Sequence, residues 1–211
     1  MISRQTNYLK GAITKMKRLF ASVISCVLIL SMICSGLTVF ATTITGAVDT
    51  DNFVRGVDVS TLDMLEDLGA RYYQNNVESD ALTILKNNGA NYVRLKLWVD
   101  PYDENGNPYG GGNNDYATTL ALARRAKNLG MGVLIDFHLS DFWTDPANQI
   151  KPKAWKDLSY SELKTTLYNY MKDTLNNFAA AGIVPEMVQV GNEISTGILH
   201  DDGKVGNGNE D

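Results

Sequence analysis

The sequence predicts an α/β fold with a parallel sheet. Short apolar segments and helix-like patterns alternate along the chain after residue 53, which is typical of strands joined by crossover helices. The helix-to-strand connections are two to four residues long, whereas the strand-to-helix connections span residues 99–114 and 139–158. Because connections that long in a compact domain are usually functional, we expect a site beyond the carboxyl ends of the strands.

Each expected element has its own sequence signal. The strands are rich in aliphatic and aromatic residues and are expected at 54–60, 91–98, 132–138 and 186–191. The helices are expected at 80–88, 116–129 and 160–181. A glycine ends each helix, as is common at helix C-termini: Gly89, Gly130 and Gly182. Asp115 marks the start of the second helix, and Ser159 with Glu162 fits a capping box at the start of the third.

This order of elements fits two architectures, a complete doubly wound domain of four strands or the N-terminal half of a (β/α)8 TIM barrel truncated after about four βα units. A buried parallel strand is normally almost continuously aliphatic. These strands instead carry polar residues toward their carboxyl ends: Asp58, Arg94, Lys96, Asp136, His138, Gln189, Asn192 and Glu193. Burying so many unpaired polar groups would cost several kcal/mol, so we expect a shared polar pocket there.

The half barrel is the favoured architecture. No glycine-rich phosphate loop follows the first strand, which weakens the doubly wound alternative. In the half barrel we expect Val57, Leu95 and Val133 to form part of an apolar layer on the inner face of the sheet.

Residues 1–41 are expected to be a secretory signal peptide. Lys15, Lys17 and Arg18 precede an apolar run at 19–37, which Val39-Phe40-Ala41 follows. The alternative is a membrane anchor, because the run approaches the length that spans a bilayer. We expect cleavage after Ala41, a mature N-terminal segment at 42–52, a partial (β/α)8 barrel domain at 53–211, and a secreted, extracellular protein that has no membrane contact once the signal is removed.

Cysteine positions and net charge argue against disulfides, cysteine-bound metals and nucleic-acid partners. Both cysteines, Cys26 and Cys34, lie inside the expected signal, so the mature chain has none to form a disulfide or bind a metal. Five of the 19 basic residues and none of the 24 acidic residues precede residue 42, which leaves a net charge of −10 after cleavage. Nucleic acid is therefore an unexpected partner. We expect no cofactor and no metal, and we expect the complete protein to be monomeric.

Asn192 and Glu193 are the principal catalytic candidates. They follow Val190-Gly191 at the end of the fourth expected strand. Hydrolysis of a glycosidic bond needs a carboxylic acid that protonates the leaving oxygen, and an adjacent amide can hold the sugar 2-hydroxyl. The alternative, a surface loop pair, is the usual interpretation of an isolated Asn-Glu dipeptide.

Five sequence blocks in order carry a family resemblance. They are Arg-Gly-Val-Asp-Val-Ser at 55–60, Val-Arg-Leu-Lys-Leu-Trp-Val-Asp-Pro at 93–101, Tyr-Gly-Gly-Gly-Asn at 109–113, Leu-Ile-Asp-Phe-His-Leu-Ser-Asp-Phe-Trp at 134–143 and Gln-Val-Gly-Asn-Glu at 189–193. Together they resemble the endo-β-1,4-galactanases of glycoside hydrolase family 53. The resemblance implies a (β/α)8 barrel and retaining cleavage of β-1,4-galactan in pectic arabinogalactan.

The resemblance also assigns catalytic roles. It implies that Glu193 is the general acid/base and that Asn192 is its amide partner. The nucleophile of the family is a glutamate at the end of strand seven, and neither Glu186 nor Glu210 replaces it. We therefore expect that this chain is either a truncated sequence or the product of a partial gene, that it lacks the nucleophile, and that it is inactive alone. The calcium site of the family belongs to late loops, so no metal is expected here.

Further residues are candidates for substrate binding. We expect Trp98 and Trp143 to stack on galactose rings. His138 is either a sugar contact, which we favour, or a packed histidine. Asp141 either accepts hydrogen bonds from sugar hydroxyls or caps local backbone.

Arg94 and Asp58 form either a structural ion pair inside the barrel or a pair that orients catalytic groups. Two other functions remain as alternatives: another glycanase on the same barrel, such as a mannanase or cellulase, and a carbohydrate-binding fragment without catalysis.

Overall fold

A computed structural model of the chain describes residues 53–206. These residues belong to one compact unit, Val48–Asp211. The expected signal peptide at 1–41, the segment at 42–52 and Glu210 lie outside the described residues. Within residues 53–206, no helix is long and apolar enough to cross a membrane.

The described residues form a parallel sheet of four strands. The strands are β1 (Gly56–Asp58), β4 (Tyr92–Leu97), β5 (Gly132–Phe137) and β6 (Met187–Val190). Their spatial order is β1-β4-β5-β6, so each strand pairs with the next one along the chain. A doubly wound sheet would reverse its strand order at a switch point. The sequential order confirms a partial (β/α) barrel.

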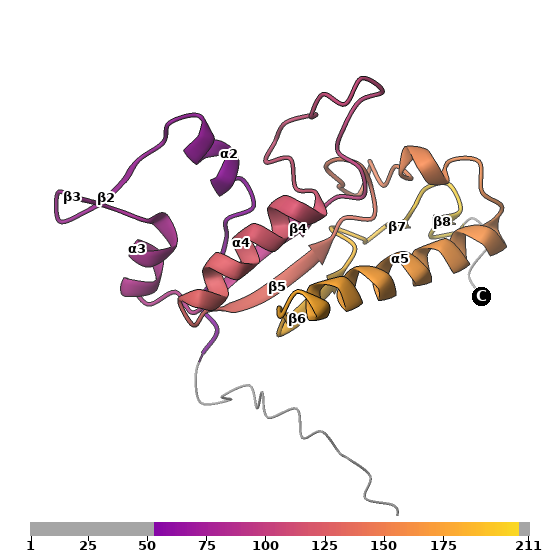
Figure 1. Ribbon diagram of the computed structural model, residues 1–211. Coiled ribbons are helices and arrows are strands. Elements are labelled where there is room, and N and C mark those ends of the chain that lie inside the picture. The colour runs from indigo at the N-terminus through magenta and orange to yellow at the C-terminus, as the bar shows by residue number, and fades with distance from the viewer. Residues whose placement is uncertain (1–52, 207–211) are drawn as a thin grey trace, which may run out of the picture. The chain divides into compact units, whose positions relative to one another are not determined.

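Helices connect successive strands, and Figure 1 shows the two longest running along the sheet. They are α3 (Ala81–Asn87), α4 (Tyr116–Asn128) and α5 (Tyr160–Ala180). Asp115 caps α4 by accepting a hydrogen bond from the Thr118 N–H. Ser159 and Glu162 form both hydrogen bonds of the expected capping box at α5. The helix starts that the sequence predicts are therefore confirmed, because a local side chain satisfies the first free N–H groups of each helix.

Several small elements were not expected from the sequence. A short helix, α2 (Leu62–Asp67), and an antiparallel hairpin, β2 (Tyr72–Gln74) with β3 (Val77–Ser79), lie between β1 and α3. The hairpin turns at Asn75 and Asn76, whose φ angles of 52° and 64° are left-handed. Asparagine tolerates this region better than most residues, so the Asn-Asn pair was the available signal. A 3-10 turn (Lys153–Trp155) and the two short strands β7 (Gly197–Ile198) and β8 (Gly203–Lys204) complete the fold.

The two faces of the sheet differ in chemistry, because side chains alternate between them. Leu95 and Ile135 are fully buried and belong to one hydrophobic core with Leu122 of α4 and Phe178 of α5. Burying one such side chain contributes about 1.5–3 kcal/mol. This outer core therefore holds the helices against the sheet.

The expectation that Val57, Leu95 and Val133 line an apolar inner face is wrong. Leu95 and Val133 are fully buried in the core shared with the helices, and Val57 shares their side of the sheet through its register with Val93. The reason is that side chains alternate between the two faces of a strand. Because Arg94 and Lys96 need polar partners and lie on the inner face, Leu95 between them faces the helices. The inner face is consequently polar.

Candidate active site

Arg94 is the centre of a polar network on the inner face of the sheet. Its Nη1 lies 2.5 Å from Asp58 Oδ2 on β1, and its Nη2 lies 2.5 Å from Asp136 Oδ2 on β5. Nη2 also donates to Asn192 Oδ1 at 2.8 Å, and Nε donates to Gln189 Oε1 at 3.2 Å. One guanidinium thus joins all four strands at their carboxyl ends, because its fork of donors can serve several acceptors at once.

Asp58 is a second junction of the network. It accepts hydrogen bonds from Lys96 Nζ at 2.9 Å and from the Ser60 hydroxyl at 2.7 Å, in addition to Arg94. Burial opposes ionisation of this carboxyl, but the hydrogen bonds from Ser60 and Lys96 outweigh burial and hold the pKa of Asp58 below its ordinary value. Both roles foreseen for the Arg94 and Asp58 pair are thus compatible with its geometry, since the pair braces the sheet and also touches Asn192 through Arg94.

Asp136, which belongs to this network, and His138 are both fully buried. His138 Nε2 lies 2.9 Å from Asp136 Oδ2, although the geometry is not that of a hydrogen bond, and His138 Nδ1 lies 3.3 Å from the Thr144 hydroxyl. Within residues 53–206, Asp136 Oδ1 has no hydrogen-bond partner. Full burial fits the packed-histidine alternative for His138, and its role as a sugar contact stays a prediction.

Asn192 and Glu193 follow β6 directly. Asn192 is 8% exposed, with Oδ1 accepting from Arg94 and Nδ2 donating to the Thr144 carbonyl at 2.7 Å. Because Arg94 only donates, this contact fixes which end of the amide is oxygen. Glu193 is exposed, and its carboxylate has no partner among the described residues. The Glu193 carboxylate is therefore open to a bound molecule beside an amide that the network holds in place.

Aromatic side chains border the site in the two long loops. Trp143 is 44% exposed, and Lys96 Nζ lies 4.6 Å from the centre of its ring. Phe142 is also exposed, which the sequence did not single out. Trp98 is fully buried, and its ring centre lies 5.0 Å from that of Phe142 and 5.9 Å from that of Trp143. Trp98 therefore supports the aromatic cluster from below, and the expectation that it stacks on a galactose ring is wrong because its ring is fully buried. Trp143, Phe142 and Tyr109, which packs on Phe142, present exposed ring surface.

Asp141 joins the two long loops. Its Oδ1 accepts a hydrogen bond from the Asp100 N–H at 3.0 Å, and its Oδ2 accepts one from the Lys153 N–H at 2.8 Å. Lys153 Nζ in turn lies 2.6 Å from Asp100 Oδ2. Both carboxylate oxygens of Asp141 are thus engaged by backbone, which fits the capping alternative, while contact with a sugar hydroxyl stays a prediction.

Two site residues, Thr144 and Gln149, were missed by sequence reasoning. Both are buried in the loop after β5, and their polar atoms reach the backbone of Asn192. No local pattern marks them, because their role depends on a tertiary contact across more than forty positions.

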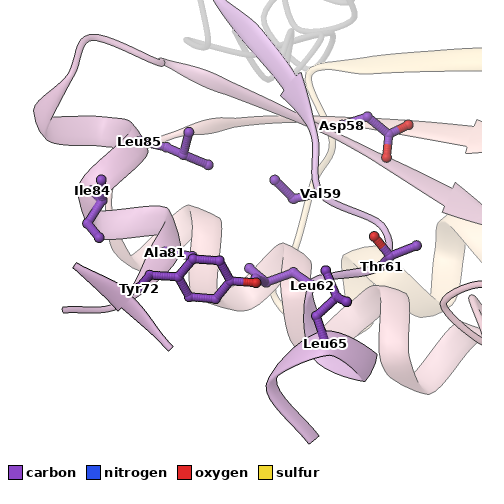
Figure 2. A pocket seen from close by; sticks show the side chains of 9 residues that line it. All are labelled: Asp58, Val59, Thr61, Leu62, Leu65, Tyr72, Ala81, Ile84 and Leu85. Carbon is purple, nitrogen blue, oxygen red and sulfur yellow. The ribbon is translucent and has the colours of Figure 1, made fainter. Parts of the chain in front are cut away.

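The described residues contain no group of three or more His, Cys, Asp or Glu side chains that could hold a metal ion. A pocket of about 260 Å³ lies beside the polar network, between β1, α2 and α3, and its lining includes Leu62, Leu65 and Leu85. Figure 2 shows that mainly apolar side chains surround it, and Asp58 is the network residue among them. Its lining lacks the convergent polar groups that sugar recognition requires. The strand ends therefore remain the candidate active site.

Comparisons with known proteins identify the family of the chain. The profile of glycosyl hydrolase family 53 matches residues 54–210. The chain is 48% identical over 147 residues to the endo-beta-1,4-galactanase of Bacillus subtilis (strain 168), covering 69% of this chain and 34% of that relative. It is 43% identical over 154 residues to the arabinogalactan endo-beta-1,4-galactanase A of Aspergillus niger, covering 72% of this chain and 42% of the relative.

A solved structure gives the same result. The Ignisphaera aggregans GH53 catalytic domain superposes with a TM-score of 0.70 at 52% identity, over 72% of this chain and 42% of that chain. The chain thus spans less than half the length of these relatives.

Proposed function

Since the chain belongs to glycosyl hydrolase family 53, we propose that the complete protein is a secreted endo-β-1,4-galactanase that cleaves plant (arabino)galactan with retention of configuration. Here the complete protein means residues 1–211 together with the remaining strands of the barrel. The observation that carries the proposal is the free carboxylate of Glu193 beside the anchored amide of Asn192 at the end of β6. The names of the Bacillus subtilis and Aspergillus niger relatives support galactan as the substrate.

Glu193 acts as both general acid and general base. In the first step it gives its proton to the glycosidic oxygen as the bond from that oxygen to the anomeric carbon breaks. A second carboxylate attacks the anomeric carbon and forms a covalent glycosyl-enzyme. In the second step Glu193 takes a proton from water, and the water oxygen displaces that carboxylate.

The resemblance to family 53 implies that the second carboxylate is a glutamate at the end of strand seven of the complete barrel, outside residues 53–206. Glu186 is unsuited to this role because it lies before β6, at the end of the strand opposite Glu193. Its side chain is paired with Lys127 and with the Val133 N–H.

The neighbours of Glu193 divide substrate recognition between them. Asn192 has two amide hydrogens, and Thr144 accepts one of them, so the other is available for the 2-hydroxyl of the sugar. Trp143, exposed at the rim of the site, offers its ring to a galactose face. The cation of Lys96 on that ring fixes its orientation.

Release of reducing ends from three polysaccharides tests the proposal. The purified complete protein is expected to hydrolyse β-1,4-galactan faster than mannan or cellulose, assayed side by side at equal mass. Equal or faster hydrolysis of mannan or cellulose would instead assign a mannanase or cellulase. Binding of galactan without release of reducing ends would assign a carbohydrate-binding protein.

A further inference from the structure

Glu193 lies in a backbone conformation that side chains rarely adopt. Its φ is 53°, in the left-handed region, although it is not a glycine. Residues held in this region at functional sites persist only where surrounding contacts enforce the conformation. The carboxylate of Glu193 cannot enforce this conformation, since it has no hydrogen-bond or ion-pair partner among residues 53–206. The contacts that hold Glu193 must therefore act on its backbone.

Gln149 supplies these contacts from a different loop. Its Nε2 donates to the carbonyl of Asn192 at 2.7 Å and lies 3.4 Å from the carbonyl of Glu193. These two carbonyls belong to the peptide groups on either side of the Glu193 α-carbon. Gln149 is only 2% exposed, so water cannot readily replace its contacts. One amide therefore lies against both peptides that flank the left-handed residue, and its short hydrogen bond restrains the first of them.

Gln149 is itself fixed in place. Its Nε2 also donates to the Asp145 carbonyl at 3.1 Å within its own loop, and its backbone carbonyl accepts from the His200 N–H at 2.7 Å. Thr144 adds a weaker contact, with its hydroxyl 3.5 Å from the Asn192 carbonyl. A side chain that is buried and anchored at both ends can transmit the position of its loop to Glu193.

We propose that Gln149 is a positioning residue that sets the orientation of the Glu193 carboxyl toward the glycosidic oxygen. This inference rests on the proposed function. The inference goes beyond the proposed function by predicting that the loop after β5 controls proton donation by Glu193, which follows β6. Gln149 itself touches neither substrate nor reacting atoms.

The test compares substrates that need proton donation with substrates that do not. Gln149→Leu and the nearly isosteric Gln149→Glu are made in the complete protein, and kcat/KM is measured because it reports the first chemical step. Galactan has a poor leaving group that needs the proton of Glu193, whereas a dinitrophenyl β-galactobioside leaves without it. The matched control is Thr196→Val, because the Thr196 hydroxyl ties the same two loops together through the Pro146 carbonyl at 2.6 Å.

We expect both Gln149 variants to lose roughly 10–100-fold in kcat/KM on galactan, as small displacements of catalytic groups do. On the dinitrophenyl substrate they should lose less than about threefold, since no proton transfer is then required. Thr196→Val should change both rates by the same factor. Equal losses of the Gln149 variants on the two substrates, or no loss on either, would overturn the positioning role. Failure of the wild-type protein to cleave galactan, with both Gln149 variants folded, would instead overturn the proposed function and with it the positioning role that rests on it.

Discussion

Replacement of Glu193 by glutamine in the complete protein is expected to lower kcat on β-1,4-galactan by about 10²–10⁴-fold, the range that general acid/base catalysis supplies. Glutamine keeps the size of the side chain but has no proton to give. The measurement is the initial rate of reducing-end release at saturating galactan. Because the carboxylate of Glu193 has no partner within residues 53–206, the substitution should leave the unfolding temperature nearly unchanged.

A glutamate at the opposite end of the same strand provides the control. Glu186→Gln keeps an acceptor for the Val133 N–H and loses only the charge paired with Lys127. Partly exposed pairs of this kind contribute little, so the rate should stay within about threefold of wild type. A near-wild-type rate of Glu193→Gln on galactan would remove Glu193 from the role of general acid.

Replacement of Arg94 by methionine is expected to destabilise the protein and to abolish most of its activity. Asp136, one of the partners of Arg94, has a fully buried side chain, whereas the Arg94 side chain is 27% exposed. Breaking a buried pair costs about 3–5 kcal/mol, and the partial exposure of Arg94 reduces our expectation to roughly 2–4 kcal/mol. Activity should fall as well, because Arg94 holds the oxygen of the Asn192 amide.

Arg125 offers a matched comparison for Arg94. It also bridges two carboxylates, those of Glu66 and Asp80, but it lies on helix α4 away from the strand ends. Both of these partners are partly exposed, so Arg125→Met should cost only about 1 kcal/mol and spare the rate. Urea unfolding of the two variants decides the matter. Equal destabilisation would mean that the inner network contributes no more than an ordinary surface cluster.

The helices and the polar cluster at the strand ends were predictable from the sequence because local chemistry indicates both. Asp115 and Ser159 satisfy helix N–H groups a few residues away, and such caps are visible without knowledge of the fold. The polar residues at the strand ends were also informative. Side chains alternate along a strand, so polar residues at positions 94 and 96 on the inner face already implied that Leu95 faces the helices. The expectation of an apolar inner face overlooked this alternation.

Long-range packing accounts for what the sequence did not reveal. In the sequence, Trp98 and Trp143 are both tryptophans at or in a long loop after a strand. In the structure, Trp98 is fully buried and Trp143 is 44% exposed. Gln149 has no distinguishing neighbours, and its contact with Asn192 joins positions that are 43 residues apart. Such differences depend on how two long loops fold over each other, which no local pattern encodes.

The stereochemistry of galactan cleavage tests the central claim most directly. Proton NMR spectra are recorded while the complete protein, at high concentration, hydrolyses a β-1,4-galactan oligosaccharide. Two successive displacements, with Glu193 first as acid and then as base, predict that the β-anomer of the new reducing end appears first and that the α-anomer grows in later by mutarotation. Initial appearance of the α-anomer, or no cleavage of galactan at all, would contradict the account.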